Sequence, residues 1–214
     1  MQVRFPSAGV AAIAVAALSL APAHVWAQPK EDPPAATDKL PNPPDKLPKA
    51  PMGDRARNID FLFDALKAAP DAEIAKQVES RIWAIWVASG SDTADLLMSR
   101  VKAAIEGKDA RLAIQLLGSI IEIKPDYIEA WNRRATLFFA LKDYGRAMAD
   151  IREVLNREPR HFGALAGLGM ILEEVGEDKQ ALDAYRNALA VNPHMQKIPE
   201  HVKALAEKVE GRDI

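Results

Sequence analysis

The chain of 214 residues contains no cysteine. A protein without cysteine cannot form a disulfide framework, a thiolate zinc site, a c-type haem attachment or a cysteine nucleophile, and it offers no thiol for lipidation. Aromatic residues make up only 6% of a chain that is 49% hydrophobic, so its core must be mostly aliphatic. The 28 basic and 30 acidic residues nearly cancel, which argues against a dedicated nucleic-acid-binding protein, because such proteins carry a basic surplus.

Catalytic motifs are also missing from the sequence. The chain contains no G-x-S-x-G, H-E-x-x-H or G-x-G-x-x-G motif and no phosphate loop. None of His161, His194 and His201 has the spacing of metal ligands such as His-x-x-x-His, and the acidic run at 173–178 is typical of a solvated helix end. We therefore expect no catalytic residue, no cofactor and no metal site.

The first 27 residues have the order of a secretory signal peptide. Arg4 gives a positive start, residues 9–20 form an apolar stretch of twelve, and small residues follow at 21–23 and 25–27. We expect cleavage after Ala27, with Ala23 as the alternative site. The apolar stretch is shorter than the roughly 20 residues of a membrane-spanning helix, so an uncleaved anchor is the less favoured alternative. The sequence therefore predicts a periplasmic or secreted protein without stable membrane insertion.

Residues 28–53 form a proline-rich segment. Eight of the fifteen prolines lie between Gln28 and Met52, and few residues there can contribute to a core, so we expect a disordered linker biased towards extended polyproline II. The sequence Asp-Lys-Leu-Pro occurs twice, at 38–41 and 45–48. We interpret the two copies as a duplicated spacer, and the alternative is a docking peptide.

From residue 54 onward the chain has an internal period of 34 residues. Three prolines and three alanines share this spacing: Pro125, Pro159 and Pro193, and Ala113, Ala147 and Ala181. In each unit apolar residues recur at the spacing of one helix face, a short break follows, and a second amphipathic stretch ends at the proline, which cannot continue a helix. The pattern predicts helical hairpins that stack, because a single hairpin is too small to bury its own apolar face.

These units resemble the tetratricopeptide repeat family over about half of the chain. The resemblance implies an all-α fold, a right-handed superhelical solenoid of helical hairpins. The predicted domain covers 54–214, and its parts are a degenerate hairpin at 55–90, repeats at 94–127, 128–161 and 162–195, and a capping helix at 199–210.

Three residues depart from a regular repeat. Trp83 and Trp86 lie three apart in the degenerate hairpin, and we interpret the pair as core rather than as an interface anchor. Arg134 occupies a position that is usually a buried leucine in the family. Because a lone buried charge is costly, either the stem of Arg134 packs while its guanidinium reaches water or an acid, or the side chain forms an interior ion pair or contacts a partner.

The resemblance also implies a binding surface, since the first helices of such repeats line a concave groove that holds a peptide or helix. The residues expected to line this groove are Met98, Lys102, Ile105, Asn132, Arg133, Thr136, Phe139, Ala166, Met170 and Glu173. Some family members grip a C-terminal carboxylate with Lys, Asn and Arg side chains. That mode is not expected here, because the corresponding positions hold Met98, Lys102, Arg133, Gly163 and Gly167.

Taken together, the sequence predicts a non-catalytic protein-interaction module, an adaptor of the bacterial cell envelope that binds a helix or an extended peptide in its groove. One alternative is a structural or self-assembling envelope protein, because the ends of repeat stacks can associate. Another is an enzyme or a small-molecule binder. Assignment as an adaptor depends partly on analogy with the family, since fold alone does not determine function.

Overall fold

The computed structural model of the protein describes the backbone of residues 52–211 and the side chains of residues 58–211. The predicted signal peptide (1–27) and both Asp-Lys-Leu-Pro copies of the predicted linker lie outside the described residues. Within residues 52–211 the chain forms nine helices and no strand. They are α1 (Met52–Lys67), α2 (Ala72–Val87), α3 (Asp92–Glu106), α4 (Ala110–Ile123), α5 (Ile128–Ala140), α6 (Tyr144–Arg157), α7 (Phe162–Glu174), α8 (Asp178–Val191) and α9 (Ile198–Val209). No helix in this part of the chain is long and apolar enough to cross a membrane.

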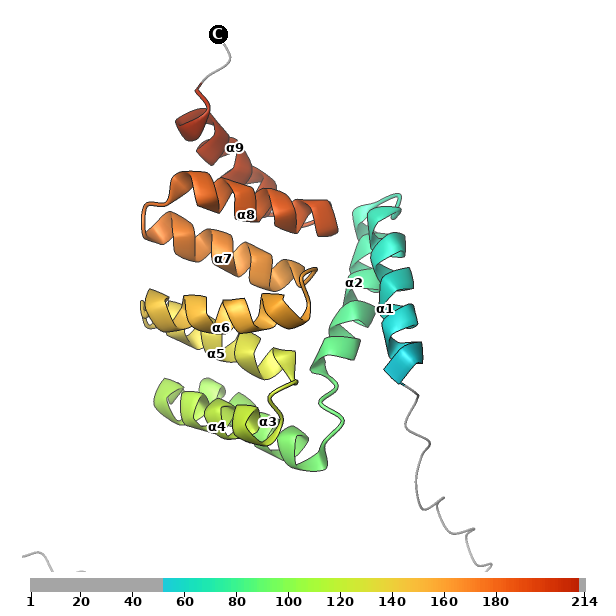
Figure 1. The fold of residues 1–214 in the computed structure, drawn as a ribbon, viewed down its shortest axis with the longest axis vertical. Helices are drawn as coiled ribbons and strands as arrows, with labels where there is room; N and C mark the ends of the chain where they lie inside the picture. The colour runs from blue at the N-terminus through green and yellow to red at the C-terminus, as the bar shows by residue number, and fades with distance from the viewer. Residues whose placement is uncertain (1–51, 212–214) are drawn as a thin grey trace, which may run out of the picture. The chain divides into compact units, whose positions relative to one another are not determined.

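Helices α3 to α8 form three antiparallel hairpins that stack in chain order, and α9 covers α8 at the end of the stack (Figure 1). The predicted all-α solenoid is confirmed. The alanines with the 34-residue spacing, Ala113, Ala147 and Ala181, are fully buried. Each lies on the second helix of a hairpin, where a small side chain allows the two helices to approach closely.

The breaks inside the hairpins share one backbone geometry. Lys108, Lys142 and Gly176 occupy equivalent positions and have φ angles of 59°, 58° and 82°. This left-handed conformation ends the first helix of each hairpin. In the first two breaks the next residues, Asp109 and Asp143, accept hydrogen bonds from backbone N–H groups of the second helix, which satisfies donors that would otherwise lack a partner.

Gly169 marks the closest approach of α7 and α8. A Cβ atom at this position would lie 2.5 Å from Cε1 of Tyr185, a side chain that is itself fully buried. Real Cβ atoms do not come so close to a ring. The packing of the third repeat therefore requires glycine at this position.

The hairpin of α1 and α2 packs against the side of the stack instead of extending it (Figure 1). The sequence predicted a degenerate hairpin at 55–90, and in the structure this hairpin contacts the turns between repeats. One polar contact reaches each of three turns: Tyr127 to the Val87 carbonyl (2.7 Å), Arg160 to Asp60 (2.7 Å) and Asn192 to Glu79 (3.0 Å). As a result, α3 begins the stack.

Both tryptophans of α2 lie in this lateral interface. Trp86 is 4% exposed and stacks on the imidazole of His161, with ring centroids 4.0 Å apart. Trp83 meets the ring of Phe162 edge-on at 5.7 Å, within the cluster of apolar side chains that joins the hairpin to the stack. The interpretation of the pair as core residues is therefore correct.

Arg134 forms an interior ion pair inside the second repeat. Its Nε and one terminal nitrogen donate to the two carboxylate oxygens of Asp150, each at 2.8 Å. Asp150 is 4% exposed, and the guanidinium lies 5.1 Å from the centre of the Trp131 ring. The acid that pairs with Arg134 therefore lies on α6, the second helix of the same hairpin.

Candidate functional site

A small cavity opens between α5 and α7, the first helices of the second and third repeats. Its volume is about 200 Å³, and only two of its lining residues are polar. We call it the apolar cavity. It is lined by Asn132, Ala135, Thr136, Phe139, Ile151, Gly163, Ala166, Gly167, Met170 and Ile171.

The apolar cavity exists because α7 presents very small residues on one face. Gly163, Ala166 and Gly167 follow the i, i+3, i+4 spacing that places side chains on the same side of a helix. A Cβ atom at Gly167 would still have 3.4 Å to the nearest atom, Cδ1 of Ile151, whereas one at Gly163 would lie 3.2 Å from the Trp83 ring. The Trp83 ring of α2 therefore leaves little room for a side chain at Gly163, whereas a side chain at Gly167 would meet only ordinary van der Waals contact.

A second cavity, of about 330 Å³, adjoins the first and shares Phe139 and Met170 with it. We call it the acidic cavity, because its other lining residues include the two carboxylates at the end of α7. These other residues are Glu173, Glu174, Tyr185 and His201. We call the two adjoining cavities together the groove; their lining residues come from α5, α6, α7, α8 and α9.

The carboxylates of the acidic cavity are held by phenol and imidazole groups. The Tyr185 hydroxyl donates to Oε2 of Glu173 at 2.8 Å, and the same oxygen lies 3.0 Å from Nδ1 of His201. The Tyr144 hydroxyl donates to Oε2 of Glu174 at 3.0 Å. Within residues 58–211, no lysine or arginine forms an ion pair with either carboxylate.

The pKa values of the two tyrosine hydroxyls are raised in this environment. Burial, together with the hydrogen bond to Glu173, raises the pKa of Tyr185 well above its usual range. Partial desolvation and the hydrogen bond to Glu174 raise the pKa of Tyr144 in the same direction. Both hydroxyls therefore remain protonated donors at neutral pH and orient the carboxylates.

By contrast, the two predicted groove residues with a positive charge, Arg133 and Lys102, each lie next to an acidic side chain. Nε of Arg133 donates to Oε1 of Glu129 at 2.7 Å, and Nδ2 of Asn132 donates to the other oxygen at 3.0 Å. Glu129 is only 3% exposed, so this arrangement stabilises a buried charge. Lys102, on the exposed surface of α3, lies 3.8 Å from Glu106. The unpaired charge of the groove is therefore negative and lies at the end of α7.

Sequence comparison assigns the family. The family profile of the tetratricopeptide repeat matches residues 128–161. A tetratricopeptide-repeat-containing protein of Rhizobium etli is 43% identical over 155 residues, which are 72% of this chain and 76% of that protein. The chain belongs to the tetratricopeptide repeat family.

Solved structures of other tetratricopeptide repeat proteins share the fold. The first such domain of Spaghetti (RPAP3), bound to the HSP90 peptide SRMEEVD, has a TM-score of 0.54 at 16% identity and covers 56% of this chain and 95% of that domain. The crystal structure of MamA has a TM-score of 0.53 at 17% identity and covers 75% of this chain and 82% of MamA. At these identities the likeness concerns the fold alone.

The predicted groove residues of this tetratricopeptide repeat protein divide into two sets. Six of them line the two cavities, and four do not. The six are Asn132, Thr136, Phe139, Ala166, Met170 and Glu173. The four are Met98, which packs against the core of the first repeat, Lys102 and Ile105, which lie exposed on α3, and Arg133, which holds Glu129.

Sequence reasoning missed Tyr185 and His201, because family analogy assigns the groove only to the first helices of complete repeats. The repeat period itself contains a signal for His201. Arg133, Gly167 and His201 are spaced 34 residues apart, so α9 occupies the place of the first helix in a fourth unit. Extending the period past the last proline would have placed His201 beside the groove. The position of Tyr185 depends on the missing side chain at Gly169, which lets the ring lie close to α7.

Proposed function

We propose that this protein is a non-catalytic adaptor of the bacterial cell envelope that captures a helix or an extended peptide of a partner protein in the groove. The groove formed by the two adjoining cavities carries the proposal. Its apolar part has room for a side chain from outside, since cavities of about 150 Å³ with apolar walls hold molecules as large as benzene. Met170, 40% exposed at the junction of the two cavities, is a flexible side chain suited to adaptable binding surfaces.

The mode of capture differs from that of the peptide complex named above. The HSP90 peptide in that complex, SRMEEVD, is acidic at its C-terminal end. The groove of the present protein is acidic at Glu173 and Glu174 and has glycine at the two third-repeat positions where carboxylate-gripping relatives carry basic residues. We therefore expect a partner other than an acidic C-terminal tail.

Site-specific crosslinking in living cells tests the groove as the working surface. Photo-reactive residues are placed at Thr136 and Met170, inside the groove, and at Lys179 on α8 as a position outside both cavities. Captured proteins are identified by mass spectrometry. We expect a specific partner from the two groove positions and none from Lys179.

A second variant in each crosslinking strain makes the result decisive. Phe139→Glu places a charge where the two cavities meet, and Gly167→Leu fills the apolar cavity. Either change should abolish the crosslink while circular dichroism and the thermal midpoint show that the protein is still folded. Crosslinks that survive both changes, or that never form at Thr136 and Met170, would contradict the proposal.

Export is part of the same proposal, and it is supported by the order of charge, apolar stretch and small residues in 1–27. The mature chain is expected to begin at Gln28. Fractionation of cells followed by mass spectrometry of the N-terminal peptide measures both the compartment and the cleavage site. A chain that keeps residues 1–27 and stays in the cytoplasm would remove the cell envelope from the proposal without affecting the groove.

Self-association is a second candidate function, and one observation favours it. The α1–α2 hairpin leaves the outer face of α3 without a preceding repeat, and Leu96 on α3 is 58% exposed. A second copy could cover this face, as the next repeat does elsewhere in the stack. Light scattering over a range of concentrations measures the mass. A dimer that Leu96→Glu converts to a monomer would support self-assembly, and a concentration-independent monomer would exclude it.

A further inference from the structure

Among the described side chains, no lysine or arginine pairs with the carboxylates at the end of α7. Glu173 and Glu174 lie in the last turn of the helix, where the helix dipole already presents a partial negative charge. Their hydrogen-bond partners among the described side chains are the Tyr185 and Tyr144 hydroxyls and the His201 imidazole. A permanently charged cation placed in the acidic cavity would therefore be attracted by both carboxylates and by the negative end of the helix dipole.

The surroundings of these carboxylates suit a particular kind of cation. The acidic cavity is walled by the rings of Phe139, Tyr185 and His201. Aromatic faces attract cationic side chains, and two carboxylates can accept the planar donors of a guanidinium in pairs. A lysine or, better, an arginine side chain meets both conditions, whereas an acidic side chain would be repelled.

The apolar cavity adjoins the acidic cavity and places a second requirement on a ligand. Phe139 and Met170 belong to both cavities, so a ligand that places a cation beside Glu173 has adjacent atoms at the mouth of the apolar cavity. The small residues Ala166 and Gly167 leave that cavity open to a large aliphatic or aromatic side chain. The two requirements apply to neighbouring residues of a single bound segment.

We propose that the groove selects partner segments in which a large apolar residue is followed or preceded closely by a basic residue. The apolar side chain occupies the apolar cavity, and the arginine or lysine side chain pairs with Glu173 and Glu174. This inference rests on the proposed function and specifies the chemistry of its partner. Charge repulsion against acidic segments supplies part of the selectivity, because specificity depends on rejecting competitors as well as on attracting the ligand.

Selection from a random peptide library tests the proposal without knowledge of the natural partner. The protein is purified as it is isolated from its cells, and it is then immobilised. A phage-displayed library of twelve-residue peptides is panned against it. We expect enriched peptides to combine a leucine, phenylalanine or similar residue with an arginine or lysine within a few positions. Affinities of the enriched peptides are then measured by fluorescence anisotropy at low and high salt.

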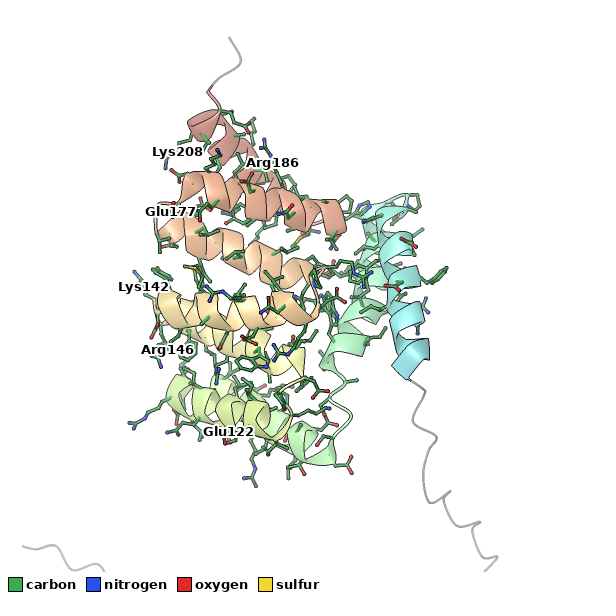
Figure 2. The ribbon with its side chains drawn as sticks, in the orientation of Figure 1. Glu122, Lys142, Arg146, Glu177, Arg186 and Lys208 are labelled. Atoms are coloured by element: carbon green, nitrogen blue, oxygen red, sulfur yellow. The ribbon has the colours of Figure 1, made fainter. Side chains whose placement is uncertain are left out.

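Matched charge variants distinguish binding by the carboxylates of the acidic cavity from a general attraction of basic peptides to this end of the molecule. Glu173→Gln and Glu174→Gln each remove one charge but keep a side-chain oxygen to accept the tyrosine hydrogen bond. Each should weaken binding about five-fold, the effect of a partly exposed ion pair. Glu177→Gln is the control, because Glu177 lies at the tip of the α7–α8 hairpin (Figure 2) and lines neither cavity. It should leave the affinity unchanged.

The outcomes distinguish this inference from the proposed function. Enriched peptides that are acidic or uncharged, or that bind equally well to the glutamine variants, would overturn the selection for a basic residue. If those peptides were still lost on Gly167→Leu, the groove would remain the binding surface with a different specificity. Enriched peptides that Gly167→Leu does not affect, or no enriched peptide at all, would overturn both.

Discussion

At the scale of single residues, Arg134 shows how a repeat accommodates an unusual side chain. A position that is usually apolar in the family carries a guanidinium whose two hydrogen bonds reach Asp150 on α6. The sequence identified the residue as exceptional, because a charged side chain occupies a position where the family usually has a buried leucine. It did not identify Asp150, since the acid lies on the opposite helix of the hairpin and the pairing depends on how the two helices face each other.

Arg134→Leu is expected to lower the free energy of unfolding by about 3 kcal/mol, because it leaves the carboxylate of Asp150 buried without its partner. The double variant Arg134→Leu/Asp150→Leu should recover most of this loss, since replacing both partners by apolar side chains removes the unpaired charge. Urea denaturation of the three proteins measures the effect. A single variant as stable as the parent would show that Asp150 is hydrated in solution.

At the scale of elements, the helices and their breaks follow directly from the 34-residue period. Each predicted repeat contains two helices in the structure, and each break begins at the same position of the period, with Lys108, Lys142 and Gly176 in the left-handed conformation. Local patterns determine these features because each helix must turn one apolar stripe towards its neighbours. The presence of Tyr185 in the groove was less predictable, since it depends on the close packing of its ring against α7 at Gly169.

Two glycines of α7 provide a matched test of that packing. Gly169→Ala should destabilise the protein by about 1–3 kcal/mol, the usual cost of overpacking, because its Cβ would overlap the ring of Tyr185. Gly167→Ala should be neutral or stabilising by up to about 1 kcal/mol, since alanine favours helix and its Cβ would have ordinary van der Waals contact.

Thermal and urea denaturation compare the two alanine variants with the parent. Equal effects of the two substitutions would mean that Tyr185 moves freely, and the packing account of the third repeat would then fail. Peptide binding serves as an additional measurement for Gly169→Ala, because a displaced Tyr185 would also disturb the carboxylate of Glu173.

At the scale of the whole molecule, the lateral hairpin links the stability of the protein to pH through His161. The side chain is fully buried, its Nδ1 accepts the backbone N–H of Ala164 at 3.0 Å, and it stacks on Trp86 of α2. Because Nδ1 is an acceptor, the neutral ring carries its proton on Nε2, which has no hydrogen-bond partner within the described part of the chain. Burial lowers the pKa of His161 from 6.5 to about 4.

The free energy of unfolding is therefore expected to be constant above pH 6.5 as far as His161 is concerned, and to fall as the pH drops from 6.5 towards 4. In this range the unfolded chain binds a proton that the folded chain excludes. The full difference in pKa corresponds to a loss of about 3 kcal/mol. Urea denaturation between pH 7.5 and 4.5 measures the slope.

His161→Asn is the control for this prediction, because asparagine keeps a side-chain acceptor at the start of α7 but does not titrate. Carboxylates contribute equally to both proteins, so the difference between their pH profiles isolates the imidazole. Parallel profiles would show that His161 is solvated and that the hairpin does not cover it in solution.

The sequence by itself determined the number and the kind of the repeats and the places where their helices break. All of these depend on periodic apolar residues, glycines and prolines, whose effects are local to one or two turns of helix. Tertiary structure alone decided that the α1–α2 hairpin packs across the inter-repeat turns, that Arg134 pairs with Asp150, and that Tyr185 and His201 meet Glu173. The 34-residue period places His201 near the groove, but each of these contacts joins residues that are distant in the chain and depends on the shapes of side chains that meet across an interface.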